Sequence, residues 1–187
     1  MDRIKLDDAE AFAALLDGHD VRHIFFGHAH RSISGVWRGI GFSALPGVAD
    51  RAGAMRAELR EELAATTVRA DVAVLYLIWR EPWMTVARDT YISRLLARVG
   101  WQTLPLQDGG EHGAARYPTL QGDEPWLGGV REVLLSSEPY AFTAEHVTHA
   151  QSLCPQARVR LVDGELLSWY GPRTAAGLRY LRDLSST

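Results

Sequence analysis

The chain has 187 residues, of which 47% are hydrophobic, and a formal net charge of -3. This length can hold one ordinary domain or two small ones, with enough apolar content for a real core. The weak negative charge leaves no overall basic field, so a nucleic-acid backbone is not expected as a partner. Cys154 is the only cysteine, which excludes an intrachain disulfide.

The first residues of the chain carry no targeting pattern. Residues 1–8 lack the apolar core of a signal peptide, and no later run approaches the roughly 18 apolar residues that a membrane helix needs. The chain as written is therefore expected to be cytoplasmic.

The first segment predicts a helix, a strand and a hairpin. Asp7 or Asp8 can cap a helix that ends at Gly18. Residues 21–26 predict a strand, and residues 33–43 predict two short strands around a glycine-containing turn.

Two histidines, His28 and His30, follow the predicted strand. Gly27 permits a turn that would point both imidazoles into one cavity, where they could bind iron, manganese or zinc. Two nitrogens alone do not complete a coordination shell, and surface or capping histidines remain the simpler interpretation of the spacing.

The run V-R-H-I-F-F-G-H-A-H-R-S-I-S-G-V-W-R-G-I-G-F-S-A-L-P-G resembles the closing segment of calcineurin-like metallophosphoesterases, in particular their cyclic-nucleotide and glycerophosphodiester phosphodiesterase branch. The resemblance implies that His28 and His30 are ligands of a binuclear metal centre, which would activate water for attack on a phosphodiester. The earlier motifs of that family, D-x-H, G-D-x-x-D and G-N-H-E, do not occur in this sequence. We interpret the segment as the truncated tail of such a fold.

A charged helix is predicted to follow. Asp50 can cap it, and Met55, Leu59 and Leu63 repeat at helical spacing, while the charges on its other faces are expected to be solvated. The change of pattern near this helix predicts two domains, residues 1–48 and residues 49–187.

The remaining chain repeats a strand, a loop and a helix three times. The strands are predicted at residues 72–78, 133–137 and 158–162, and the first of these is an unbroken apolar run of strand length. After the first strand Pro82 forces a loop, Asp89 or Thr90 can cap a helix, and Gly100 ends it. Thr143 can cap the second helix and Pro172 can open the third.

Aromatic and charged residues gather in the loops after these three strands. Parallel strands connected by right-handed crossovers present such loops at one edge of the sheet. The candidate ligand-binding residues are Trp79, Arg80, Trp83, Glu138, Tyr140, Phe142, Trp169, Tyr170 and Arg173. Large flat side chains suit a bulky, partly planar ligand.

No nucleophile beside a base, phosphate cradle or carboxylate pair is present in these loops, so catalysis is not expected. His146 and His149, three residues apart on the second helix, are interpreted as surface histidines.

The segments Y-L-I-W-R-E-P-W-M-T-V-A-R-D-T-Y-I, R-Y-P, L-L-S-S-E-P-Y-A-F and V-D-G-E-L-L-S-W-Y-G-P-R, in this order, resemble the carboxy-terminal lobe of helical-backbone substrate-binding proteins of ABC importers. Those proteins carry cobalamin, haem or iron-siderophore ligands. The resemblance implies that Trp83, Trp169 and the S-E-P-Y-A-F loop line a ligand cleft, and that Glu138 meets basic residues of a permease. The first lobe has no counterpart here, and residues 121–131 are glycine-rich where that family has a helix.

The sequence therefore predicts an α/β fold, a three-layer sandwich with a mostly parallel sheet and a small N-terminal α/β appendage. The leading hypothesis is non-catalytic binding of a metal-containing macrocycle or chelate, with an ABC-importer permease as partner and a periplasmic or cell-surface location. A homodimer could supply the missing wall of the cleft. The alternatives are a phosphodiesterase fragment that uses a divalent metal at His28 and His30, and a hybrid of two truncated genes without activity.

Overall fold

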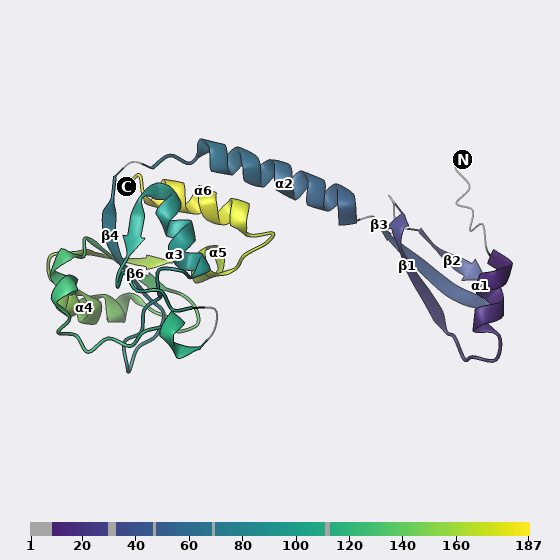
Figure 1. Ribbon diagram of the computed structural model, residues 1–187, viewed down its shortest axis with the longest axis horizontal. Helices are drawn as coiled ribbons and strands as arrows, with labels where there is room; N and C mark the ends of the chain where they lie inside the picture. The colour runs from purple at the N-terminus through teal and green to yellow at the C-terminus, as the bar shows by residue number, and fades with distance from the viewer. Residues whose placement is uncertain (1–8, 30–32, 47, 69, 111–112) are drawn as a thin grey trace. The chain divides into compact units, whose positions relative to one another are not determined.

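The computed structural model describes residues 9–29, 33–46, 48–68, 70–110 and 113–187 (Figure 1). The chain divides into two compact units, Met1–Ala54 and Met55–Thr187. The division falls inside helix α2 (Val48–Ala65), whereas the sequence predicts a boundary at the start of that helix. None of the helices in the described ranges is long and apolar enough to cross a membrane.

The first unit is a small sheet with one helix. Its strands are joined in the order β1-β3-β2, with β1 parallel and β2 antiparallel to β3. Arg38 and Gly39 have φ angles of 50° and 82°, as a two-residue hairpin loop between β2 and β3 requires. Helix α1 packs on the sheet, with the rings of Phe12 and Trp37 6.1 Å apart. The elements are α1 (Ala9–Leu16), β1 (His23–Ala29), β2 (Ile33–Trp37) and β3 (Ile40–Pro46).

The second unit is built on a four-stranded parallel sheet in the order β5-β4-β6-β7. The central strands are largely buried on both faces, which explains the unbroken apolar sequence of β4 and the apolar residues 133–135 of β6. The strands are β4 (Val72–Leu77), β5 (Trp101–Thr103), β6 (Glu132–Ser136) and β7 (Arg158–Val162).

Helices cover both faces of this sheet. Side chains such as Tyr76 and Leu134 pack against α3, α5 and α6, whereas Leu75 and Leu135 pack against α4 and η3 on the opposite face (Figure 1). The helices are α3 (Tyr91–Leu96), α4 (Ala144–Leu153), α5 (Gly164–Ser168) and α6 (Thr174–Leu184), with the short 3₁₀ helices η1 (Ala97–Val99), η2 (Ala114–Arg116) and η3 (Pro125–Gly129). The predicted three-layer α/β sandwich with a mostly parallel sheet is confirmed.

Charges on helix α2 do more than face solvent. Glu62 accepts hydrogen bonds from Arg179 at 2.7 Å and Arg182 at 3.0 Å, and Glu58 accepts one from Arg179 at 2.9 Å. The hydrogen bond from Arg179 and the two positive charges hold the pKa of Glu62 below its usual value. The prediction that the charged face of α2 is solvated was therefore wrong for Glu58 and Glu62, because these two residues form ion pairs with arginines of α6.

Several element boundaries differ from the sequence prediction. Helix α2 begins at Val48, so Asp50 lies inside it instead of capping it. Helix α6 begins at Thr174, two positions after Pro172, because Arg173 is its N-cap. The segment after β7 was predicted to be a loop but contains α5, whose first turn is capped by Asp163 accepting from Leu166 N.

Candidate ligand-binding site

A hollow of about 430 Å³ lies beyond the carboxyl ends of β4 and β6. After β5 the chain crosses to the other side of β4, so the strand order reverses between β4 and β6. Such a reversal point is where open α/β sheets bind ligands. The volume lies within the range of small-molecule sites. The hollow is lined by Ile78, Trp79, Met84, Ile92, Tyr117, Pro139 and Ser168.

Two exposed tryptophans stand at this edge of the sheet, each held by a residue of the loop after β6. Trp79, which is 41% exposed, meets the ring of Tyr140 edge-on with centroids 5.6 Å apart. Trp169, which is 57% exposed, donates from Nε1 to Glu138 Oε2 at 2.7 Å. The structure thus forms two contacts between these loops, Trp79 with Tyr140 and Trp169 with Glu138. Of the predicted ligand-binding residues, only Trp79 lines the hollow. Their role in binding stays a prediction.

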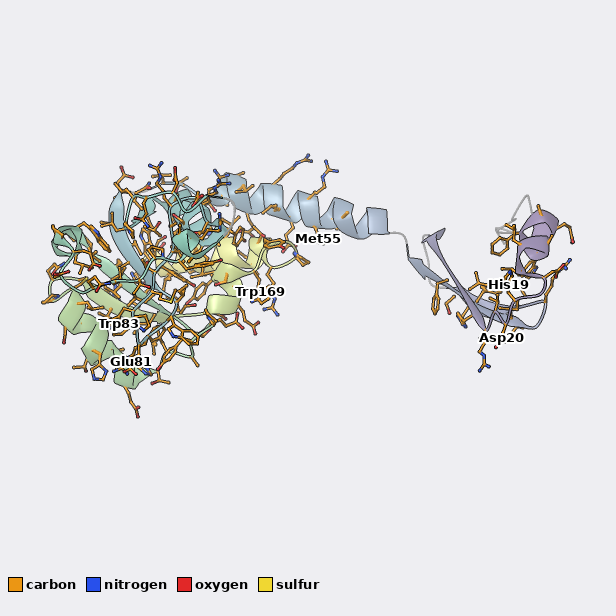
Figure 2. All side chains as sticks on the ribbon, turned by 60° about the horizontal axis from the view of Figure 1, so that its bottom comes forward. His19, Asp20, Met55, Glu81, Trp83 and Trp169 are labelled. Carbon is orange, nitrogen blue, oxygen red and sulfur yellow. The ribbon has the colours of Figure 1, made fainter. Side chains whose placement is uncertain are left out.

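Other predicted site residues serve packing more than access to the hollow. Trp83, labelled in Figure 2, stacks on Phe142 with centroids 6.0 Å apart and planes 7° apart. Phe142 is only 6% exposed and belongs to the core on the α4 face of the sheet. Arg80 pairs with Glu81 at 3.3 Å and lies 5.8 Å from the ring centroid of Trp83. These contacts stiffen the loop after β4.

The remaining predicted residues lie beyond α5. Tyr170, 77% exposed, contacts the ring of Tyr91 with centroids 6.1 Å apart. Arg173 is paired with Glu165 on α5. Neither Tyr170 nor Arg173 is among the residues that line the hollow.

Sequence reasoning missed part of the lining. Met84 and Tyr117 were not selected, because they come from irregular segments without periodicity, which the bridge between Met84 and Thr119 brings together. Ile92 was assigned only to the buried face of its helix. Ser168 belongs to the S-W-Y-G-P-R motif, but only the aromatic and charged residues of that motif were predicted to bind a ligand.

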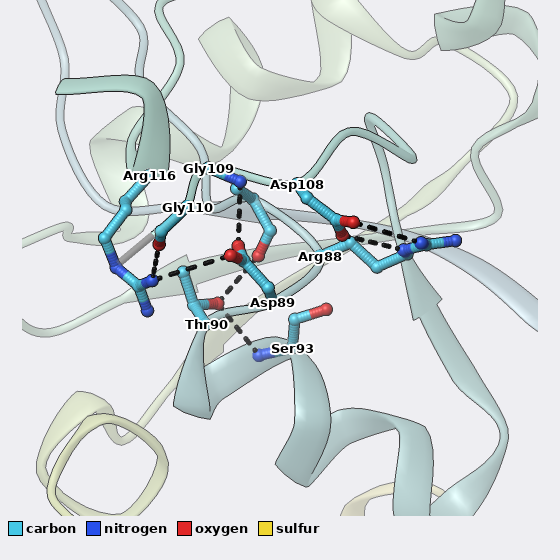
Figure 3. Close-up of polar contacts among 9 residues, drawn as sticks. Arg88, Asp89, Thr90, Ser93, Asp108, Gly109, Gly110 and Arg116 are labelled. Carbon is cyan, nitrogen blue, oxygen red and sulfur yellow. Dashed lines mark hydrogen bonds and ion pairs between the residues drawn. The ribbon is translucent and has the colours of Figure 1, made fainter. Parts of the chain in front are cut away.

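The segment that carries Tyr117 is anchored by Asp89. Its carboxylate accepts from Gly109 N at 2.9 Å and lies 3.6 Å from Arg116 Nη1, which also donates to Gly110 O (Figure 3). The hydrogen bond from Gly109, helped by the charge of Arg116, holds the pKa of Asp89 below its usual value. Thr90, not Asp89, caps α3, by accepting from the N–H of Ser93 at 3.3 Å. Asp89 instead holds the segment that carries Tyr117, one of the residues that line the hollow, through its contacts with Gly109 and Arg116.

Buried hydroxyls lie at the ends of the same strands. Tyr76 is fully buried and donates to Ser136 Oγ at 3.0 Å, and burial raises the pKa of its hydroxyl, which therefore stays neutral. The Ser168 hydroxyl is close enough to influence Tyr76, but it makes no hydrogen bond of acceptable geometry with any described residue. One polar atom at the hollow is thus without a partner in the described part of the chain.

His146, which was predicted to be a surface histidine, is partly exposed and also makes specific contacts. Its Nδ1 accepts from Thr143 N at 2.9 Å, and its Nε2 lies 3.1 Å from the hydroxyl of Tyr140. Because a backbone N–H can only donate, Nδ1 is the acceptor in the contact with Thr143, and Nε2 faces the Tyr140 hydroxyl. His146 therefore links the first turn of α4 to the aromatic pair Trp79 and Tyr140.

We expect His146→Leu to lower the free energy of unfolding by about 1 kcal/mol, since an N-terminal capping interaction and a hydrogen bond are lost together. Urea unfolding followed by circular dichroism measures the change. His149→Leu, an exposed histidine on the same helix, is the matched control and should stay within about 0.5 kcal/mol of the wild type. Equal effects of the two substitutions would contradict the capping role.

The predicted metal ligands lie in the first unit. His28 is in β1, but its side chain is not described, and His30 lies outside the described residues. Across the ranges that are described, no group of three or more His, Cys, Asp or Glu residues could hold a metal ion. A divalent metal at His28 and His30 therefore stays a prediction, and no chemical step is derived from it.

No protein-family model and no curated protein sequence matches the chain. Solved structures do match. The periplasmic haem-binding protein HutB of Vibrio cholerae has a TM-score of 0.56 and 16% identity, over 73% of this chain and 56% of that chain. The periplasmic haem-binding protein RhuT of Roseiflexus sp. RS-1 has a TM-score of 0.54 and 20% identity, over 75% and 56%. The siderophore periplasmic binding protein from the fuscachelin gene cluster of Thermobifida fusca has a TM-score of 0.51 and 16% identity, over 73% of this chain and 53% of that chain.

The chain thus spans little more than half the length of these three proteins. Identities of this size show the fold alone. None of the findings supports the resemblance of the first segment to metallophosphoesterases. The chain contains the α/β fold of one lobe of the helical-backbone substrate-binding proteins.

Proposed function

We propose that the chain binds a metal-containing macrocycle or chelate at the hollow, without catalysing a reaction. One observation carries the proposal. Trp79 and Trp169 come from different loops, remain exposed, and are fixed at one sheet edge beside an apolar hollow by Tyr140 and Glu138. A bulky, flat-faced ligand gains most from such preorganised aromatic walls.

The comparisons support the class of ligand. Two of the matching proteins are named for haem binding and one for siderophore binding, and all three are named as periplasmic. By analogy, the chain would act in a periplasmic or cell-surface setting and deliver its ligand to an ABC-importer permease. Cobalamin belongs to the same proposed class, and the choice among the ligands is left to experiment.

A single lobe makes a weaker receptor than two lobes. Ligand sites of this size ordinarily bury most of the ligand surface, and half a cleft leaves the opposite face in water. We therefore expect the isolated chain to bind with an affinity well below that of a two-lobed receptor. A homodimer that supplies the second wall remains part of the proposal, and sedimentation velocity with and without ligand tests it.

Binding is tested by titrating the protein with haemin, cyanocobalamin and a ferric siderophore, followed by ligand absorption and tryptophan fluorescence. We expect saturable binding of at least one ligand and a loss of affinity of about tenfold or more in Trp169→Ala, because an exposed aromatic side chain next to Ser168, at the rim of the hollow, is removed. Leu161→Ala is the matched control, since Leu161 is 44% exposed on β7 and does not line the hollow.

The outcomes separate cleanly. Binding that is unchanged in Trp169→Ala and Trp79→Ala would place the ligand elsewhere on the chain. Absence of saturable binding by all three ligands would overturn the proposed function and favour the inactive hybrid. The phosphodiesterase alternative predicts bound metal and hydrolysis of bis-nitrophenyl phosphate that is lost in His28→Ala.

A further inference from the structure

We infer that the ligand presents an electrically neutral, largely apolar face to this lobe, with one hydrogen-bonding group opposite Ser168. The inference rests on the proposed function and narrows its ligand class. It follows from two sets of observations, the lining of the hollow and the pairing of the charges around it.

The lining carries no formal charge. The lining has seven residues. Four are apolar (Ile78, Met84, Ile92 and Pro139), two are aromatic (Trp79 and Tyr117) and one is a serine (Ser168). A charged group seated against such a wall loses its hydration without gaining a counter-ion, which costs several kcal/mol. An uncharged, apolar surface loses little polar hydration and gains contact with the wall.

The charges at the edge of the sheet already have partners. Arg80 is paired with Glu81, and Arg173 with Glu165. Arg116 is held by Asp89, and the Glu138 carboxylate accepts the Trp169 N–H. An anionic ligand would compete with these carboxylates for the arginines, so each arginine attracts it less than an unpaired cation would.

Ser168 supplies the exception to an apolar wall. Its Oγ is buried, makes no acceptable hydrogen bond with a described residue, and belongs to the lining. Its polar neighbour, the Tyr76 hydroxyl, already donates to Ser136. A buried hydroxyl without a well-formed hydrogen bond costs up to about 1–3 kcal/mol, and a ligand reduces this cost by placing a carbonyl or hydroxyl opposite it. The position is rigid, because Ser168 ends α5 and the neighbouring Trp169 is held by Glu138.

The test compares two ferric chelates that differ in charge. A ferric trihydroxamate is neutral, whereas a ferric tricatecholate is trianionic, and both surround the same metal with six oxygens. We expect the wild-type chain to bind the neutral chelate about tenfold or more tightly than the trianion, measured by fluorescence quenching at fixed ionic strength.

A charge placed in the lining should change this preference. Tyr117 is 42% exposed and lines the hollow, so Tyr117→Arg adds a cation there without burying it in the core. We expect the preference to shift toward the trianion by about tenfold. Met55→Arg adds the same charge at an exposed position of α2 outside the lining and should leave the preference unchanged. Ser168→Ala should weaken binding of the neutral chelate several-fold.

The result separates this inference from the proposed function. Equal affinities for the two chelates, or tighter binding of the trianion by the wild type, would overturn the inference while the binding function stands. The same holds if Met55→Arg shifts the preference as much as Tyr117→Arg, because the effect would then be one of net charge. Binding of neither chelate, together with no binding of haemin or cyanocobalamin, would overturn both.

Discussion

Gly177→Ala is expected to destabilise the second unit by about 3 kcal/mol. Gly177 lies in α6 where that helix crosses α5, and a Cβ at this position would stand 2.3 Å from the carbonyl oxygen of Leu166. A backbone oxygen cannot move aside as a side chain does. The two helices must therefore separate, which opens the core around Leu167 and Leu178.

The matched control for this prediction is Gly53→Ala. Gly53 is also in a helix, α2, but a Cβ there meets nothing within 4 Å. Alanine is a better helix former than glycine by about 1 kcal/mol, so the control is expected to leave the stability unchanged or raise it. Urea unfolding of both variants measures the difference. A Gly177→Ala protein as stable as the wild type would show that α5 and α6 are not in close contact.

The same substitution is expected to affect ligand binding, because α5 leads directly to residues at the hollow. Helix α5 ends at Ser168, and Trp169 follows directly as its C-cap. A shift of α5 would move both the Ser168 hydroxyl, which lines the hollow, and the exposed side chain of Trp169 beside it. We therefore expect Gly177→Ala to weaken ligand binding even under conditions in which the variant is folded.

Much of the second unit could be predicted from the sequence because its signals are strong and local. A parallel strand covered on both faces favours apolar residues throughout, as residues 72–78 show, and residues 133–135 of the second strand follow the same rule. Gly100 was predicted to end its helical segment, and it adopts a φ of 85° that suits glycine. The convergence of the loops follows from the parallel order of the strands, which fixes the edge where their carboxyl ends lie.

The contents of the site were harder to predict, because similar residues serve different purposes. Phe142 and Tyr140 belong to one loop, yet Phe142 is buried in the core while Tyr140 supports Trp79. Composition alone does not separate these roles. His146 occupies the position where Glu or Gln completes a capping box, and the spacing T-x-x-H after a loop was the available signal.

Arg160→Met is expected to lower the free energy of unfolding of the second unit by about 3 kcal/mol, because it leaves the largely buried carboxylate of Glu132 without its positively charged partner. Arg160 donates to both oxygens of Glu132, at 2.9 and 3.1 Å, and the two side chains are 11% and 14% exposed. It also donates to Leu184 O at 2.7 Å and lies 5.5 Å from the ring centroid of Trp101. One side chain thus joins β7, β6 and the end of α6.

The matched control is Arg158→Met, on the same strand. Arg158 is exposed and its side chain donates to Thr187 O at 3.0 Å, so loss of that side chain should cost no more than about 0.5 kcal/mol. The double variant Glu132→Leu with Arg160→Met then tests the mechanism. If the cost arises from the stranded carboxylate, the double variant must be more stable than Arg160→Met alone, since an apolar pair leaves no buried charge.

A double variant that is less stable than Arg160→Met would assign the cost to the bonds with α6 instead. The distinction bears on the site as well as on the fold. Strand β7 ends at Val162, and Asp163 caps the helix that delivers Ser168 and Trp169 to the hollow. If the pair with Glu132 is what fixes β7 against β6, it also sets the separation between Glu138 and Trp169, which follow those two strands. In that case we expect Arg160→Met to weaken ligand binding and the double variant to restore it, a pattern that loss of the contacts to α6 alone would not produce.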